Sequence, residues 1–124
     1  IREYIRLNKN KLGSVAILTP YKNQTALLKR YCGRLIGDDI LTIHGSQGKE
    51  WDTVILSVCD TNDKYFTDSN NPRSGGHLIL NTAVSRVRVR LVVACDVAYW
   101  SNQQGQLLCD IIMNKTEGIS HKLW

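Results

Sequence analysis

The chain has 124 residues, enough for one domain with a single hydrophobic core. Hydrophobic residues make up 43% and charged residues 22%, which are ordinary values for a globular protein, and no apolar run approaches the roughly 18 residues that a membrane-spanning helix needs. The net charge of +5 is compatible with a polyanionic partner but does not by itself indicate one. These properties argue against a membrane as the partner.

The cysteines and the first residues bear on location and completeness. The four cysteines are widely separated and form no Cys-x-x-Cys pair, which favours reduced, mostly buried thiols over zinc ligands, so we expect no metal site. No signal-type segment is present, so we expect an intracellular protein, in the cytoplasm or with the nucleoid or nucleus. Because the sequence opens on Ile1 and its only methionine is Met113, we expect a piece of a longer polypeptide.

In the first half of the chain, the apolar pattern predicts a short leading helix, a strand, a second helix and two further strands. The leading helix carries Ile1, Tyr4 and Ile5, and the second helix ends near Gly37. The apolar stripe of the second helix consists of Leu27, Leu28, Tyr31 and Leu35. Continuous apolar runs predict the strands at residues 15–18, 40–43 and 54–58.

In the second half, turn-forming residues predict a long polar loop at residues 60–77. A strand is expected at residues 91–95, with one helix before it and one after it. The stripes of these helices are Leu80, Ala83, Val84 and Val87, and Leu107, Leu108, Ile111 and Ile112. Continuous apolar strands that alternate with helices predict an α/β fold, with three α/β/α layers around an open, mainly parallel sheet.

Polar segments lie near the ends of these strands, where open α/β sheets bind ligands. Residues 19–21 follow the first strand, residues 44–50 the second and Asp60 the third, and Arg86 lies on the helix that leads into the fourth. We expect these segments to gather at the carboxyl edge of the sheet. For residues 44–50, the alternatives are a ligand-binding loop, whose hydroxyl, amide and imidazole groups donate to phosphate oxygens, and an ordinary glycine-rich turn.

Three segments carry a family resemblance. Residues 42–52 read Thr-Ile-His-Gly-Ser-Gln-Gly-Lys-Glu-Trp-Asp and resemble motif V of superfamily 1 helicases, closest to the RecD-like and nonsense-mediated-decay-type branches. Residues 81–88 read Asn-Thr-Ala-Val-Ser-Arg-Val-Arg and resemble motif VI, and residues 19–21 with Gln24 resemble the segment upstream of motif V. The resemblance, in family order over residues 14–95, implies that residues 1–124 are a single C-terminal RecA-like domain.

The resemblance also assigns roles to particular residues. The nucleotide is implied to contact Gln47, Gly48, Lys49 and Glu50, with the Glu50 carboxylate accepting from the ribose hydroxyls. Single-stranded DNA or RNA is implied to contact Thr19, Tyr21, Thr42 and His44. The aromatic residues that could stack bases are Tyr21, Trp51, Tyr65, Phe66 and Trp100. Isolated aromatic residues are more often part of the core, so only Tyr21 is chosen.

Arg86 is the residue that the resemblance selects as the catalytic arginine finger. On a helix, residues two apart point about 200° apart, so Arg88 cannot serve the same spot as Arg86. Arg88 and Arg90 are left as solvated or nucleic-acid-side charges. The chain departs from the family at Leu78 and Ile79, which stand where members often carry two arginines, and at Val87, where members usually carry an alanine.

The chain has no Walker A segment, because Gly48-Lys49 is followed by Glu50 rather than by Ser or Thr. ATP and Mg²⁺ are therefore expected to bind mainly to a preceding N-terminal RecA-like domain of the same polypeptide. The predicted function is the second motor domain of an ATP-dependent DNA or RNA helicase, inactive by itself. The alternatives are a non-catalytic nucleic-acid-binding α/β module and an unrelated flavodoxin-like domain.

Overall fold

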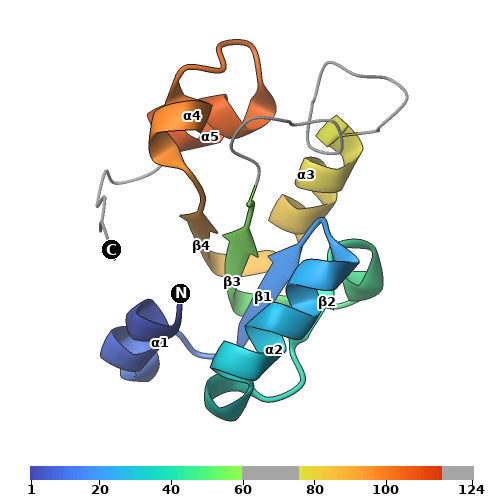
Figure 1. The fold of residues 1–124 in the computed structure, drawn as a ribbon, viewed down its shortest axis with the longest axis vertical. Coiled ribbons are helices and arrows are strands. Elements are labelled where there is room, and N and C mark those ends of the chain that lie inside the picture. Colours follow the sequence, from blue (N-terminus) through green and yellow to red (C-terminus); the bar gives the residue numbers. More distant parts are fainter. Residues whose placement is uncertain (60–75, 116–124) are drawn as a thin grey trace.

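The computed structural model describes residues 1–59 and 76–115, in which helices and strands alternate along the chain (Figure 1). In chain order, the elements are α1 (Arg2–Asn8), the 3₁₀ turn η1 (Lys9–Lys11), β1 (Val15–Thr19), α2 (Lys22–Ile36), β2 (Ile40–Thr42), the 3₁₀ turn η2 (His44–Ser46), β3 (Trp51–Ser57), α3 (Gly76–Ser85), β4 (Val87–Ala94), α4 (Val97–Ser101) and α5 (Leu107–Lys115). Most of the predicted polar loop lies outside the described residues, and its last two residues begin α3.

The strands form one parallel sheet in the order β2-β1-β3-β4. Helices α1 and α2 cover one face, and α3, α4 and α5 cover the other (Figure 1). The predicted three-layer α/β fold is therefore confirmed, and each predicted strand is present. No helix within residues 1–59 and 76–115 is long and apolar enough to cross a lipid bilayer.

Successive side chains of the central strands enter opposite cores. In β1, Ala16 and Leu18 pack on the side of α3, α4 and α5, whereas Ile17 packs on the side of α1 and α2, and all three are fully buried. In β3, Val54 and Leu56 enter the first core and Ile55 enters the second. Because both faces are covered, these strands show a continuous apolar run instead of an alternation with polar residues.

Helix α2 buries only part of the predicted row, since Leu28 and Leu35 pack against the sheet. Leu28 and Cys32 are buried against the sheet, whereas Leu27 and Tyr31 are 47% and 55% exposed. Both rows have the i, i+4 spacing of a helix face, and they are rotated by about 100° from each other. Periodicity therefore predicted the helix correctly, but the expected burial of Leu27 and Tyr31 was wrong.

The helix predicted through Val87 ends at Ser85, and Val87 is the first residue of β4. From Val87 to Arg90, valine and arginine alternate, which is the period of a strand. Pairing with β3 decides between the two patterns, because Val87 stands opposite Trp51 in the register of the sheet. Arg86 lies in the turn after α3 and Arg88 lies on β4, so the expectation that these two arginines lie on a helix was wrong.

A glycine couples the loop before β1 to the start of β3. Gly13 has φ +64°, and a Cβ atom added there would collide with the Asp52 carboxylate. Asp52 is held by two hydrogen bonds, since the Ser14 amide donates to its Oδ2 at 3.1 Å and its own amide donates to Ser14 Oγ at 2.8 Å. The pair ties segments that lie 38 positions apart in the sequence.

We expect Gly13→Ala to lower the free energy of unfolding by about 1–3 kcal/mol, because an L-residue is strained at positive φ and the Asp52 hydrogen bonds must shift. The matched control is Gly33→Ala on α2, where an added Cβ would meet nothing within 4 Å. That variant should gain up to about 1 kcal/mol from helix propensity. Urea denaturation measures both, and equal stability of the two variants would contradict the prediction.

Candidate functional site

The carboxyl ends of β1 and β2 bring together the residues predicted to contact a single strand. Thr19 and Thr42 are register partners, and the Ile43 amide donates to the Thr19 carbonyl at 3.0 Å. Thr19 is fully buried, and its Oγ1 accepts a hydrogen bond of 3.4 Å from the Tyr21 amide. Thr19 therefore shapes the turn that carries Tyr21 and offers no side-chain surface of its own.

The turn η2 follows β2 at the same edge. Thr42 Oγ1 accepts from the Gly45 amide at 3.0 Å, and the buried Ser46 hydroxyl donates to the Ile43 carbonyl at 2.5 Å. These bonds fold the chain back on itself and leave the His44 side chain exposed. A Cβ at Gly45 would lie 3.1 Å from Thr42 Oγ1, so a larger residue at this position would have to displace the Thr42 hydroxyl by a few tenths of an ångström.

Residues 47–50 lead from this edge to the start of β3 at the opposite edge of the sheet. All four are exposed, and Gly48 has φ +78°, a conformation that favours glycine. Since β2 and β3 are both parallel to β1, the connection must return along the length of a strand before β3 begins. Glu50 therefore lies near the amino end of β3, and the expectation that every motif segment gathers at the carboxyl edge was wrong.

Arg86 also lies at the amino edge, in the turn between α3 and β4. Its amide donates to the Ala83 carbonyl at 3.2 Å, and its carbonyl accepts from the Trp51 amide at 3.0 Å. The latter bond brings Arg86 beside the residue that follows Glu50, although the two lie far apart in the sequence. The structure thus groups Glu50 with Arg86 at one edge, and Tyr21 with His44 at the other.

The Arg86 side chain holds a donor without an acceptor. The residue is partly exposed, yet its Nε is buried and has no hydrogen-bond partner within the described ranges. A buried donor that lacks an acceptor costs about 1–3 kcal/mol. An anionic group that reached the guanidinium would satisfy this donor, because arginine presents several N–H groups in one plane.

Arg88 on β4 contacts the same edge. Its Nε lies 3.4 Å from Glu50 Oε2, and its Nη1 lies 4.0 Å from Asp52 Oδ1. The Arg88 and Glu50 side chains are 54% and 57% exposed, so the pair contributes little to stability. It places the Arg88 guanidinium beside the Glu50 carboxylate. This contact was not predicted, and only the alternation of valine and arginine in β4 could have suggested it.

Residues 1–98 match the sequence model of a family described as an AAA domain. The chain belongs to this AAA domain family. The match includes all the predicted site residues.

Two known proteins resemble this AAA domain. The DNA polymerase alpha-associated DNA helicase A of Saccharomyces cerevisiae is 31% identical over 87 residues, which cover 68% of this chain and 12% of that protein. The C-terminal domain of a possible DNA helicase from Lactobacillus plantarum WCFS1 matches in fold with a TM-score of 0.51 and 22% identity, over 75% of this chain and 63% of the other. The AAA domain thus spans a small part of the yeast relative.

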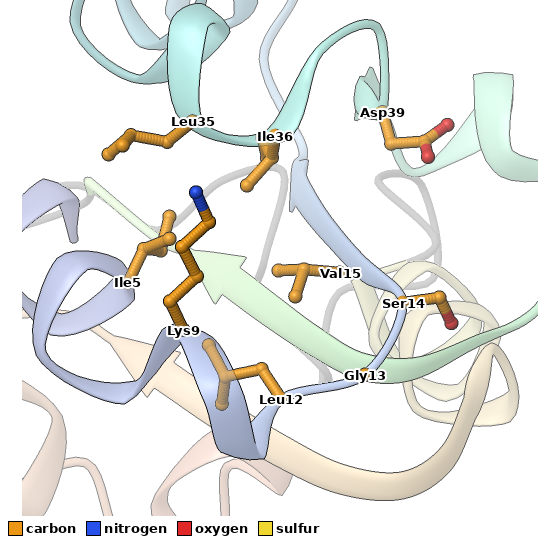
Figure 2. A pocket seen from close by; sticks show the side chains of 9 residues that line it. All are labelled: Ile5, Lys9, Leu12, Gly13, Ser14, Val15, Leu35, Ile36 and Asp39. Carbon is orange, nitrogen blue, oxygen red and sulfur yellow. The ribbon is translucent and has the colours of Figure 1, made fainter.

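A hollow of about 370 Å³ lies on the α1 and α2 side of the AAA domain, at the amino end of β1 (Figure 2). Its walls are mainly apolar, with the Lys9 side chain reaching in from η1 and the Asp39 carboxylate on another side. The lining residues are Ile5, Lys9, Leu12, Gly13, Ser14, Val15, Leu35, Ile36 and Asp39. None of them is a predicted site residue of this AAA domain.

Two thiols of the AAA domain have the chemistry of buried groups, whereas Cys59 is exposed. Burial, together with the neighbouring Asp96 carboxylate, raises the pKa of Cys95 to about 11. Burial also raises the pKa of Cys32. A raised pKa disfavours the thiolate, which is the form that binds metals and reacts. Within residues 1–59 and 76–115, no three His, Cys, Asp or Glu residues are grouped so that they could hold a metal ion.

Proposed function

We propose that this AAA domain is the second motor domain of an ATP-dependent helicase of superfamily 1, in the RecD-like or nonsense-mediated-decay-type branch. The motif V and motif VI residues support the proposal, as do a relative named as a DNA helicase and a fold neighbour titled as a possible one. The single observation that carries it is the hydrogen bond from the Trp51 amide to the Arg86 carbonyl. That bond joins motif V to motif VI at one edge of the sheet.

The amino edge is the proposed nucleotide side. ATP with Mg²⁺, bound mainly by a first RecA-like domain of the same polypeptide, supplies the phosphoryl group whose transfer drives the motor. Gln47, Gly48 and Lys49 form an exposed loop beside it. Glu50, which lies beside Arg88, accepts from the ribose hydroxyls. Arg86 reaches the transferring phosphoryl group, and the buried Nε without an acceptor supports this fit.

The carboxyl edge is the proposed strand side. The exposed His44 imidazole and the half-buried Tyr21 ring lie on adjacent turns, after β2 and β1. Thr42 adds a hydroxyl that already bonds to the Gly45 amide and can still donate to a phosphate oxygen. An imidazole and a hydroxyl donate to the backbone, and an aromatic ring stacks on a base of any sequence. These groups suit a single strand of DNA or RNA.

The two sites give the domain a motor role. When ATP closes the cleft between the two RecA-like domains, Arg86 and Glu50 move with this domain, and so do Tyr21 and His44 on its far edge. When the cleft opens after hydrolysis, the domain has moved along the strand. Coupling between the edges runs through residues 43–50, which connect β2 to β3.

The isolated 124-residue chain is expected to hydrolyse no ATP, because no residue of it forms a Walker A loop. The full-length protein is expected to hydrolyse ATP and to do so faster with single-stranded DNA or RNA present. Phosphate release measures both. Steady turnover by the isolated chain that Glu50→Gln abolishes would refute the proposal.

The control for that experiment is strand binding with and without a non-hydrolysable ATP analogue. A motor domain predicts that the analogue changes the affinity of the full-length protein. Binding that is equally tight with and without it, in a protein that lacks ATP turnover, would instead support the non-catalytic nucleic-acid-binding module.

A further inference from the structure

The outer face of α2 is cationic and carries no acid. Residues 22–36 contain no Asp or Glu. The cations are Lys22, Lys29, Arg30 and Arg34, and all four are exposed. Within the described part of the chain, none of them pairs with a carboxylate. The helix is held to the sheet by Leu28 and Cys32 on its other side, so the cations have no part in the packing.

The position of α2 relates this face to the strand side. The helix begins at the residue after Tyr21, at the carboxyl edge, and runs along the face of the sheet to its amino edge (Figure 1). Its 15 residues extend over about 22 Å at 1.5 Å per residue. Asp38 and Asp39 follow directly after Gly37, so the acid-free surface ends where the helix ends.

Apolar and aromatic groups lie along the same exposed surface. Leu27 and Tyr31 are one turn apart and are 47% and 55% exposed. The guanidinium carbon of Arg30 lies 6.0 Å from the centroid of the Tyr31 ring. Cations that follow a phosphate backbone, together with aromatic rings that bases can stack on, are the combination found in proteins that bind single strands.

We propose that the outer face of α2 binds the single strand as it continues beyond the carboxyl edge. This inference rests on the proposed function, because it extends the path that begins at Tyr21 and His44. The lysines and arginines contact the phosphates, and Tyr31 offers a stacking surface. Charge favours a polyanion as the occupant, since several cations stand together without a neighbouring acid.

The test is the salt dependence of strand binding by the full-length protein. Arg30→Gln/Arg34→Gln removes two charges from α2, and the matched control Lys9→Gln/Lys11→Gln removes two exposed charges from η1. Each lost phosphate contact should lower the slope of log affinity against log salt by about 0.7 for a single strand. The slope for the α2 variant should therefore be smaller by about 1.4. Between 50 and 200 mM salt, the wild-type protein should then lose roughly sevenfold more affinity than the α2 variant.

Strand length sharpens the test. At about 3.4 Å per nucleotide, α2 corresponds to roughly six or seven nucleotides. The difference between the α2 variant and the wild type should thus be large with a strand of about 20 nucleotides and small with one too short to reach beyond the carboxyl edge. The control variant should match the wild type with both.

Three results would overturn the inference while leaving the proposed function in place. They are equal slopes for the wild type and the α2 variant, an equal loss in the control, and a loss seen only with duplex DNA or RNA. Absence of any strand binding by the wild-type protein, in contrast, would overturn the proposed function as well. Tyr21→Ala should lose affinity for the short strand, which reaches only the carboxyl edge. This variant therefore tests the proposed strand side independently of the α2 face.

Discussion

Replacing Arg86 by Ala in the full-length protein is expected to reduce ATP turnover by a factor of about 10³–10⁵, the usual effect of losing an arginine finger. The guanidinium is always charged and presents a planar fork of donors, which suits the negative charge that spreads over the transferring phosphoryl group. Its buried Nε has no acceptor in the described part of the chain, so a donor of this side chain is left for an anionic group. Strand binding should stay close to the wild-type value, because Arg86 lies at the opposite edge from Tyr21 and His44.

Three further variants make this prediction specific. Arg86→Lys retains the charge but not the fork, and it should recover a small part of the turnover. Arg90 lies on β4 and has no proposed contact with the nucleotide, so Arg90→Ala should hydrolyse ATP normally. Arg88→Ala should raise the KM for ATP by up to about fivefold, because an exposed pair with Glu50 is worth at most about 1 kcal/mol. Near-normal turnover in Arg86→Ala would show that the finger is another arginine.

Replacing Trp100 by Ala is expected to lower the free energy of unfolding by about 3–5 kcal/mol, the range for removing a buried tryptophan. Trp100 is fully buried in the core beneath α3 and α5, and its ring meets that of Tyr99 edge to face at 5.3 Å. Helix α4, which carries it, is only five residues long, and it is capped by Asp96, whose carboxylate accepts from the Tyr99 amide. So short a helix depends on its buried side chain.

Urea denaturation of three variants checks this assignment. Trp100→Phe should lose less than Trp100→Ala, because an apolar ring remains and the indole N–H, which is buried without a partner in the described residues, is removed. Leu7→Ala on α1 should change stability by no more than about 0.5 kcal/mol, since Leu7 is 71% exposed. A Trp100→Ala protein as stable as Leu7→Ala would mean that α4 does not contribute to the core.

The local sequence pattern was sufficient to predict the strands and part of the core of this protein. The continuous apolar runs predicted each strand, because a strand buried on both faces has no polar positions. The burial of Trp51 and Trp100 was also predicted, and the structure confirms it. The motif residues were predicted from their resemblance to motifs V and VI of superfamily 1 helicases. Their roles stay predictions until the variants are measured.

The tertiary structure decided what local pattern could not. Periodicity gives the angle between the Leu27 and Leu28 rows of α2, but packing against the sheet chooses which row is buried. Likewise, the strand order and the return of residues 43–50 along the sheet place Glu50 and Arg86 at the amino edge, opposite Tyr21 and His44. The contact between Glu50 and Arg88 spans 38 positions and depends on the pairing of β3 with β4. Such contacts are set by which strands become neighbours, and a single segment of sequence carries no information on its neighbours in space.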